Sequence, residues 1–110
     1  MAYDKEIEEA VESICGSRDG LTSKKMFGGI GYLYRGNMAF GILNDCLFVR
    51  LGSDDAAQAH IAAGRALPFD VTGRAMKGWV MVPKSALEGQ PGYRQWLERG
   101  LAFAGSLPTK

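Results

Sequence analysis

The stretch KMFGGIGYLYRGNMAFGILNDCLFVRL, from Lys25 to Leu51, decides the fold of this chain. It contains three six-residue segments rich in aromatic, β-branched and long apolar residues, a composition and length typical of β-strands. Two pairs of residues that tolerate the positive φ of tight turns, Gly36-Asn37 and Asn44-Asp45, separate these segments. The stretch therefore predicts a meander of three antiparallel strands, at 30–35, 38–43 and 46–51.

Two-residue turns determine the pairing of these strands by counting. The first turn predicts that Leu33 faces Phe40, and the second predicts that Gly41 faces Phe48. Because side chains alternate along a strand, this register divides them between two faces of the sheet. The expected core face holds Leu33, Met38, Phe40, Ile42, Leu47, Val49 and Leu51.

The opposite face lacks the polar row that is typical of a solvent-facing antiparallel sheet. Two interpretations of it stay open. The first is that the rings of Tyr32 and Phe48 shield Gly41, a weak strand position. The second is an interaction surface for a partner, because aromatic residues and arginine are enriched where proteins meet. The expected members of this surface are Tyr32, Tyr34, Phe48 and Arg50, and the same face also holds Ile30, Ala39, Gly41, Leu43 and Cys46.

The remaining segments complete a single domain over residues 1–110. We expect amphipathic or capped helices at 4–15, 53–64 and about 91–104, and further strands at 22–27, 67–71 and 78–82. In the last helix we expect Trp96 to be a core residue. Helices at both ends of the chain with an antiparallel sheet between them predict a two-layer α+β domain, with the N- and C-terminal helices packed on one face of the sheet.

Composition and charge exclude several classes of protein. The 110 residues are 46% hydrophobic and 23% charged, with a net charge of +1, and the basic residues are scattered rather than gathered in the stripe of a typical DNA-binding protein. No apolar run approaches the length of about 20 residues that a membrane helix needs. The acidic N-terminus does not resemble a signal peptide, so we expect a cytoplasmic protein.

The residues that could carry chemistry form no catalytic or metal-binding set. The segment GGIG at 28–31 opens a strand rather than a helix and is not followed by the lysine of a phosphate-binding loop. We therefore favour a bulge or turn there, with positive φ at Gly28 or Gly29. Cys15 and Cys46 are expected to be reduced, and His60, the single histidine, has no evident partner. We predict no metal and no cofactor.

The motif MFGGxG, formed by Met26, Phe27, Gly28, Gly29 and Gly31, also carries a family resemblance. Together with the residues that follow it, this motif resembles the N-terminal domain of the TfoX/Sxy competence regulators. The resemblance implies an antiparallel sheet with helices on one side, a role similar to that of a transcriptional co-regulator of DNA-uptake genes, and no enzymatic activity or cofactor. Full-length regulators carry a second, C-terminal helical domain, and we expect this chain to be a stand-alone version. The other residues that carry the resemblance are Gly36, Phe40, Leu47, Arg50, Gly64, Pro68, Phe69, Val82, Pro83, Leu87, Trp96 and Ala104.

Two functional hypotheses follow from these observations. The first is a small non-enzymatic regulatory domain that acts by protein–protein contact, either by self-association as a homodimer or by binding a regulator. The alternative is a nucleic-acid-binding module, in which Tyr32, Tyr34 and Phe48 would stack on bases. Its expected phosphate contacts are Lys24, Lys25, Arg35, Arg50, Arg74 and Lys77.

Overall fold

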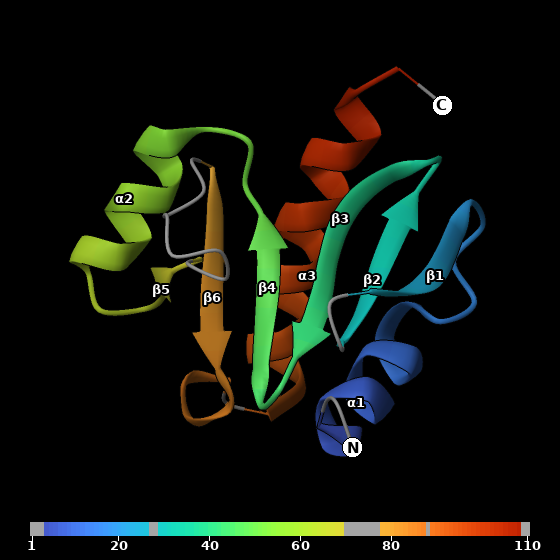
Figure 1. Cartoon of the computed structure of the whole chain (residues 1–110), viewed down its shortest axis with the longest axis horizontal. Helices are drawn as coiled ribbons and strands as arrows, with labels where there is room; N and C mark the ends of the chain where they lie inside the picture. Colours follow the sequence, from blue (N-terminus) through green and yellow to red (C-terminus); the bar gives the residue numbers. More distant parts are fainter. Residues whose placement is uncertain (1–3, 27–28, 70–77, 88, 109–110) are drawn as a thin grey trace.

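The computed structural model describes residues 4–26, 29–69, 78–87 and 89–108 of the chain. Helices and strands follow one another in the order that the sequence predicts (Figure 1). The elements are α1 (Lys5–Cys15), β1 (Leu21–Met26), β2 (Gly29–Tyr34), β3 (Asn37–Leu43), β4 (Cys46–Arg50), α2 (Asp54–Ala62), β5 (Leu67–Pro68), β6 (Trp79–Pro83), the 3₁₀ turn η1 (Lys84–Ala86) and α3 (Gly89–Ser106).

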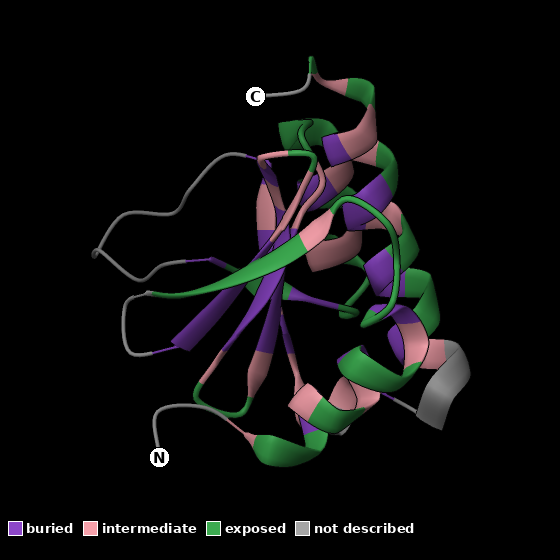
Figure 2. Ribbon diagram, turned by 90° about the vertical axis from the view of Figure 1, so that its right-hand side faces the viewer, coloured by how far each residue is buried: buried purple, intermediate pink, exposed green. Residues whose placement is uncertain are grey.

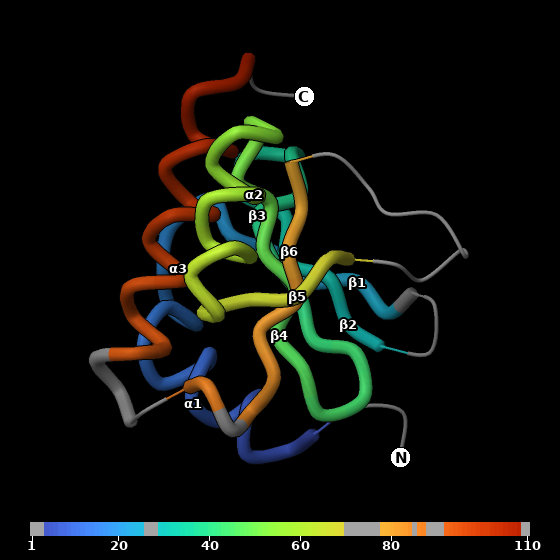
Figure 3. The backbone as a smooth tube through the Cα atoms, turned by 90° about the vertical axis from the view of Figure 1, so that its left-hand side faces the viewer, coloured from blue at the N-terminus to red at the C-terminus, as the bar shows by residue number. Residues whose placement is uncertain are grey.

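The strands form one antiparallel sheet of six in the order β1-β2-β3-β4-β6-β5. The helices lie on one side of this sheet, with α3 along its middle, α1 near β1 and β2, and α2 beside β5 and β6 (Figures 1 and 3). Buried residues run along the strands and along the sides of the helices that face them (Figure 2). The predicted two-layer α+β fold is therefore confirmed. We call the sheet face that carries the helices the core face, and the opposite one the open face.

Side chains at the predicted caps begin the first two helices. The Asp4 carboxylate accepts hydrogen bonds from the backbone N–H groups of Glu6 and Ile7, at 2.8 and 3.2 Å, and thereby satisfies donors that α1 leaves unpaired at its first turn. Ser53 does the same for α2, since its hydroxyl accepts from the backbone N–H of Ala56 at 3.4 Å. Both starts lie where the sequence predicts them.

Helix α3 is the centre of the core. Leu97 is fully buried and Trp96 is only 5% exposed, which confirms the prediction that Trp96 is a core residue. Gly100 lets the helix approach the sheet closely, because a Cβ there would lie 2.5 Å from the carbonyl oxygen of Ala39 on β3. The absence of a side chain at this position thus determines the distance between the two layers.

The second hairpin of the meander has the predicted register. Gly41 pairs with Phe48 and Leu43 pairs with Cys46, so the turn consists of Asn44 and Asp45. Asn44 has a φ of 54°, a left-handed conformation that asparagine adopts more easily than most residues. The residues of the turn were therefore sufficient to predict this hairpin correctly.

The first hairpin differs from the prediction in both its turn and its register. Tyr34 pairs with Asn37, so the two-residue turn is Arg35-Gly36, with φ values of 55° and 85°, rather than Gly36-Asn37. Leu33 pairs with Met38 and Tyr32 pairs with Phe40, which leaves Ala39 as the extra residue of a β-bulge. This shift moves the side chains of β2 to the faces opposite those that we expected.

The glycine motif contributes through close approach. Gly28 lies outside the described residues, as does Phe27, and Gly29 does not have the positive φ that we predicted as one possibility. Gly29 is instead an extended residue of β2 that pairs with Met26. A Cβ on Gly29 would collide with the carbonyl oxygen of Ile42 on β3, so steric exclusion rather than a turn explains glycine at this position.

Candidate functional site

The structure divides the predicted interaction surface between the two faces of the sheet. Tyr32 lies on the core face, where it is only 2% exposed and its ring centroid is 5.2 Å from that of Phe40. Its hydroxyl donates a hydrogen bond to Oε2 of Glu12 on α1, at 3.1 Å. Burial, with the neighbouring Glu12 carboxylate, raises the pKa of Tyr32, so the phenol stays neutral and keeps this bond. The prediction that Tyr32 lies on the face of the sheet opposite the helices is therefore wrong.

Tyr34 lies on the core face as well. It is half-buried against the core, close to the end of α3, where a Cβ on Gly105 would lie 3.0 Å from its ring. The guanidinium of Arg35 lies 5.0 Å from the Tyr34 ring centroid, a cation–π distance. The bulge at Ala39 is the physical reason for both corrections, because it turns Tyr32 and Tyr34 toward the helices.

Phe48 remains on the open face, where it is the centre of an aromatic cluster, and Arg50 lies at the edge of that face, because its guanidinium also contacts Phe103 of α3. Its ring is stacked on that of Phe69, with centroids 5.1 Å apart and an interplanar angle of 4°. Trp79, on the neighbouring strand β6, contacts both rings, at 5.9 and 5.6 Å. We call Phe48, Phe69 and Trp79 the aromatic triad. It brings a residue after β5 into contact with β4 and β6, which no local pattern in the sequence indicates.

Gly41 on β3 makes room for the Phe48 ring of this triad. Gly31 pairs with Gly41, and Gly41 pairs with Phe48, so the three lie in one row across the sheet. A Cβ on Gly41 would collide with the Phe48 ring and would lie 2.6 Å from the carbonyl oxygen of Ile30. The predicted shielding of Gly41 by Phe48 is thus confirmed, whereas Tyr32 has no part in it.

Arg50 lies at one end of the triad. Its guanidinium is 5.6 Å from the ring centroid of Trp79 and 5.1 Å from that of Phe103 on α3. Two aromatic rings therefore hold the cation, and it is half-buried rather than fully exposed. A guanidinium held in this way keeps its N–H groups available to a carboxylate.

Apart from Thr22 and Lys24 on the edge strand β1, the open face carries further apolar side chains that are only partly buried. Alternation from Tyr32 turns Leu33 toward this face, and Met38, its partner on β3, goes with it, although we expected both in the core. Leu67 on β5 is 52% exposed, and Met81, with which it pairs, is half-buried. The described helices lie on the other side of the sheet (Figure 3). The open-face apolar set is Leu33, Met38, Leu43, Leu67 and Met81.

The four described cations of the nucleic-acid hypothesis do not form one surface. Lys24 and Lys25 are consecutive residues of β1 and therefore point to opposite faces. Arg35 lies in the first turn over Tyr34, and Arg50 lies between Trp79 and Phe103. Arg74 and Lys77 lie outside the described residues.

The described thiols and acidic side chains form no metal site. Cys15 and Cys46 are both free, and burial raises the pKa of the Cys15 thiol to about 11. Among the described residues, no three His, Cys, Asp or Glu side chains are grouped so as to hold a metal ion. In the same part of the chain, no helix is both long and apolar enough to cross a membrane.

Sequence reasoning missed two features of the molecule. Phe69 and Trp79 were placed in strands, but their contact with Phe48 depends on the order of strands in the sheet. His60 has partners that we did not predict, since its ring lies 4.9 Å from that of Trp96 and its Nδ1 accepts a hydrogen bond from Nε of Arg65. The one sequence signal that points to these contacts is the presence of aromatic residues in segments that otherwise follow strand or helix periodicity.

Comparison with known proteins agrees with the motif and the fold. The family model described as the TfoX N-terminal domain matches residues 13–104, which covers nearly all of the described elements. No curated protein and no solved structure matches the chain significantly. On the family match, this chain belongs to the TfoX N-terminal domain family.

Proposed function

We propose that this chain is a small, non-enzymatic regulatory domain of the cytoplasm that acts by binding a protein partner through its open face. Membership of the TfoX N-terminal domain family supports a small regulatory domain. The finer assignment, contact with a protein in the course of transcriptional regulation, is our proposal. The observation that carries it is the open-face apolar set, which shares with the aromatic triad the side of the sheet opposite the described helices (Figure 3).

The composition of this face suits a protein rather than a nucleic acid. The open-face apolar set consists of exposed or half-buried leucines and methionines, whose burial would contribute about 25 cal/mol per Å² of apolar surface removed from water. The three rings of the triad contact one another on the same face, and side chains that are already packed lose less entropy on binding. Arg50 at the margin could pair with a partner's carboxylate. A second copy of the chain is the simplest partner, because an apolar patch can form a twofold contact with itself.

The first experiment tests the open face by two substitutions that leave the triad intact. Leu67→Ser and Met81→Ser remove apolar surface from an exposed and a half-buried position. Leu107→Ser, at a half-buried position after α3, is the matched control. Sedimentation velocity measures self-association, and affinity capture followed by titration with the purified partner measures binding to another protein.

The proposal expects the Leu67→Ser and Met81→Ser double variant to stay folded and to lose at least about tenfold in affinity, whereas Leu107→Ser binds as the parent does. Equal affinity in parent and double variant would contradict it. Fluorescence anisotropy with random single- and double-stranded DNA tests the alternative. Tight binding to DNA that weakens steeply with increasing salt concentration would favour a nucleic-acid-binding module instead.

A further inference from the structure

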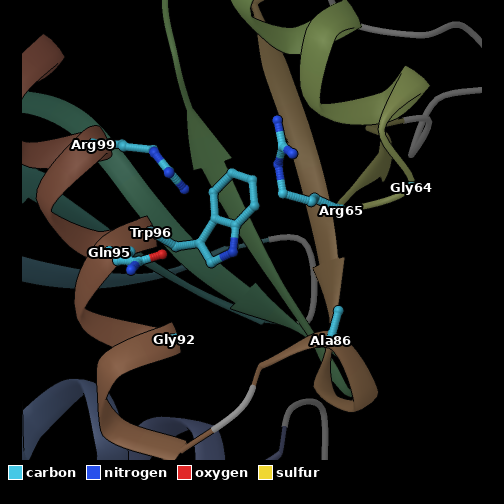
Figure 4. A pocket seen from close by; sticks show the side chains of 7 residues that line it. All are labelled: Gly64, Arg65, Ala86, Gly92, Gln95, Trp96 and Arg99. Carbon is cyan, nitrogen blue, oxygen red and sulfur yellow. The ribbon is translucent and has the colours of Figure 1, made fainter.

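A second candidate site lies on the helix side of the molecule, away from the open face. A hollow of about 390 Å³ separates the start of α3 from the segment that follows α2 and from η1 (Figure 4). This volume is in the range of small-molecule pockets. It is lined by Gly64, Arg65, Ala86, Gly92, Gln95, Trp96 and Arg99, none of which belongs to the open-face apolar set.

Trp96 forms the fixed wall of the hollow. Its side chain is almost fully buried, and in Figure 4 it stands between the side chains of Arg99 and Arg65. The guanidinium carbon of Arg99 lies 4.7 Å from the Trp96 ring centroid. This contact restrains Arg99 without using any of its N–H donors.

Arg65 is restrained by a different contact. Its Nε donates a hydrogen bond to Nδ1 of His60 at 3.0 Å, and the His60 ring in turn lies 4.9 Å from that of Trp96. Because Nδ1 accepts this bond, the neutral imidazole carries its proton on Nε2. The two terminal NH₂ groups of Arg65 are left for another acceptor. Each arginine is thus held in place by aromatic side chains, directly or through His60, with most of its donors still available.

The described part of the chain supplies no carboxylate to these two arginines. Its ion pairs join Lys5 to Glu8, Arg18 to Glu98, and Lys84 to Asp4 and Glu6. The pKa of His60 is lowered by burial and then by the positive charges of Arg99 and Arg65, so both cations act on the same small region. Two guanidinium groups with no described counter-ion beside one hollow make it electropositive.

We infer that this hollow binds a small molecule through a phosphate or carboxylate group, with Arg65 and Arg99 as the anion-binding residues. Guanidinium groups match the oxygens of both anions with paired N–H donors. The amide of Gln95, which also lines the hollow, adds a neutral donor. The proposal is independent of the partner surface on the open face, so either can fail without the other.

The test uses Trp96 as its own reporter. The chain has two tryptophans, so Trp79→Phe leaves Trp96 as the only indole. In this background, fluorescence is titrated with inorganic phosphate, glycerol 3-phosphate and succinate, at constant ionic strength maintained with chloride. The indole N–H resonance of Trp96 is followed by NMR in the same titrations. Inorganic phosphate and glycerol 3-phosphate test for a phosphate site, and succinate tests for a carboxylate site.

The expected result is a saturable change with at least one of the three probes. Arg65→Gln and Arg99→Gln should each weaken binding at least about tenfold. Arg65→Lys should weaken it less than Arg65→Gln does, because lysine keeps the positive charge, although it lacks the paired N–H donors. The control is Arg94→Gln, which removes the same charge from an exposed position of α3 and should bind as the parent does.

Two results would overturn the inference. One is the absence of a saturable signal in the parent with all three probes. The other is equal weakening by Arg94→Gln, which would mean general attraction to a positive surface. Circular dichroism and unfolding midpoints of each variant separate loss of binding from loss of fold.

Discussion

Tyr32 on β2 pairs with Phe40 on β3, and their rings lie 5.2 Å apart on the side of the sheet that α1 and α3 cover. This single pairing separates Tyr32 from Phe48, which lies on the other side of the sheet over Gly41. It exists because one bulged residue, Ala39, interrupts the alternation of side chains along β3. The partner surface that we propose is consequently built without the two tyrosines.

The first prediction concerns the burial of Tyr32. Tyr32→Ser should cost about 3–5 kcal/mol of the free energy of unfolding, because a buried ring is lost from the core. Tyr32→Phe keeps the ring and loses only the hydrogen bond to Glu12, so it should cost about 1 kcal/mol. Urea denaturation measures both. Near-parental stability of Tyr32→Ser would mean that the observed register of β2 is wrong.

The second prediction concerns the space that Gly41 leaves for Phe48. Gly41→Ala should destabilise the fold by about 1–3 kcal/mol, since the added methyl group collides with the Phe48 ring and with a backbone oxygen of β2. A double-mutant cycle with Phe48→Leu measures how much of this cost depends on the ring. If the two effects simply add, Phe48 does not lie over Gly41 in solution.

The third prediction concerns the two thiols. With a pKa of about 11, the buried Cys15 is a thiolate in only about one molecule in a thousand at pH 8. Cys46 is half-buried and should react first with a disulfide reagent in the folded protein. Cys15→Ser should leave the fast phase unchanged, and Cys46→Ser should remove it. A fast phase that survives Cys46→Ser would show that Cys15 is accessible.

The fourth prediction is a pH dependence that comes from His60. The pKa of His60 in the folded protein is below its ordinary value of 6.5, because of burial and then of Arg99 and Arg65. As the pH falls through 6.5, the unfolded chain takes up the proton before the folded one does, so stability should begin to fall near 6.5 and continue to fall until the pH passes below the lowered pKa of the folded state. His60→Gln should make this part of the pH profile flatter. Identical profiles for parent and variant would exclude His60 as the cause.

The sequence alone determined those features that depend on neighbours along the chain. Asp4 and Ser53 begin helices because each cap is a contact over two or three residues, and Asn44-Asp45 determines the second hairpin for the same reason. The order of elements and the burial of Trp96 follow from periodicity within single segments.

Only the tertiary structure decided which face each strand of the first hairpin presents. Propensity allowed a turn at Gly36-Asn37, but the bulge at Ala39 and the turn at Arg35-Gly36 place Tyr32 against α1 and Asn37 in a buried position. A one-residue shift changes little in local backbone energy, whereas it exchanges every side chain between core and solvent. Packing against the helices therefore selects the register.

Both candidate sites depend on the same kind of long-range decision. The aromatic triad joins Phe48 to residues that lie about 20 and 30 positions further along the chain, because β6 inserts between β4 and β5. The hollow joins Arg65 to Arg99 through Trp96 and His60, which belong to different helices. The sequence determined that these aromatic and basic side chains exist, and the packing of α2 and α3 against the sheet determined which of them meet.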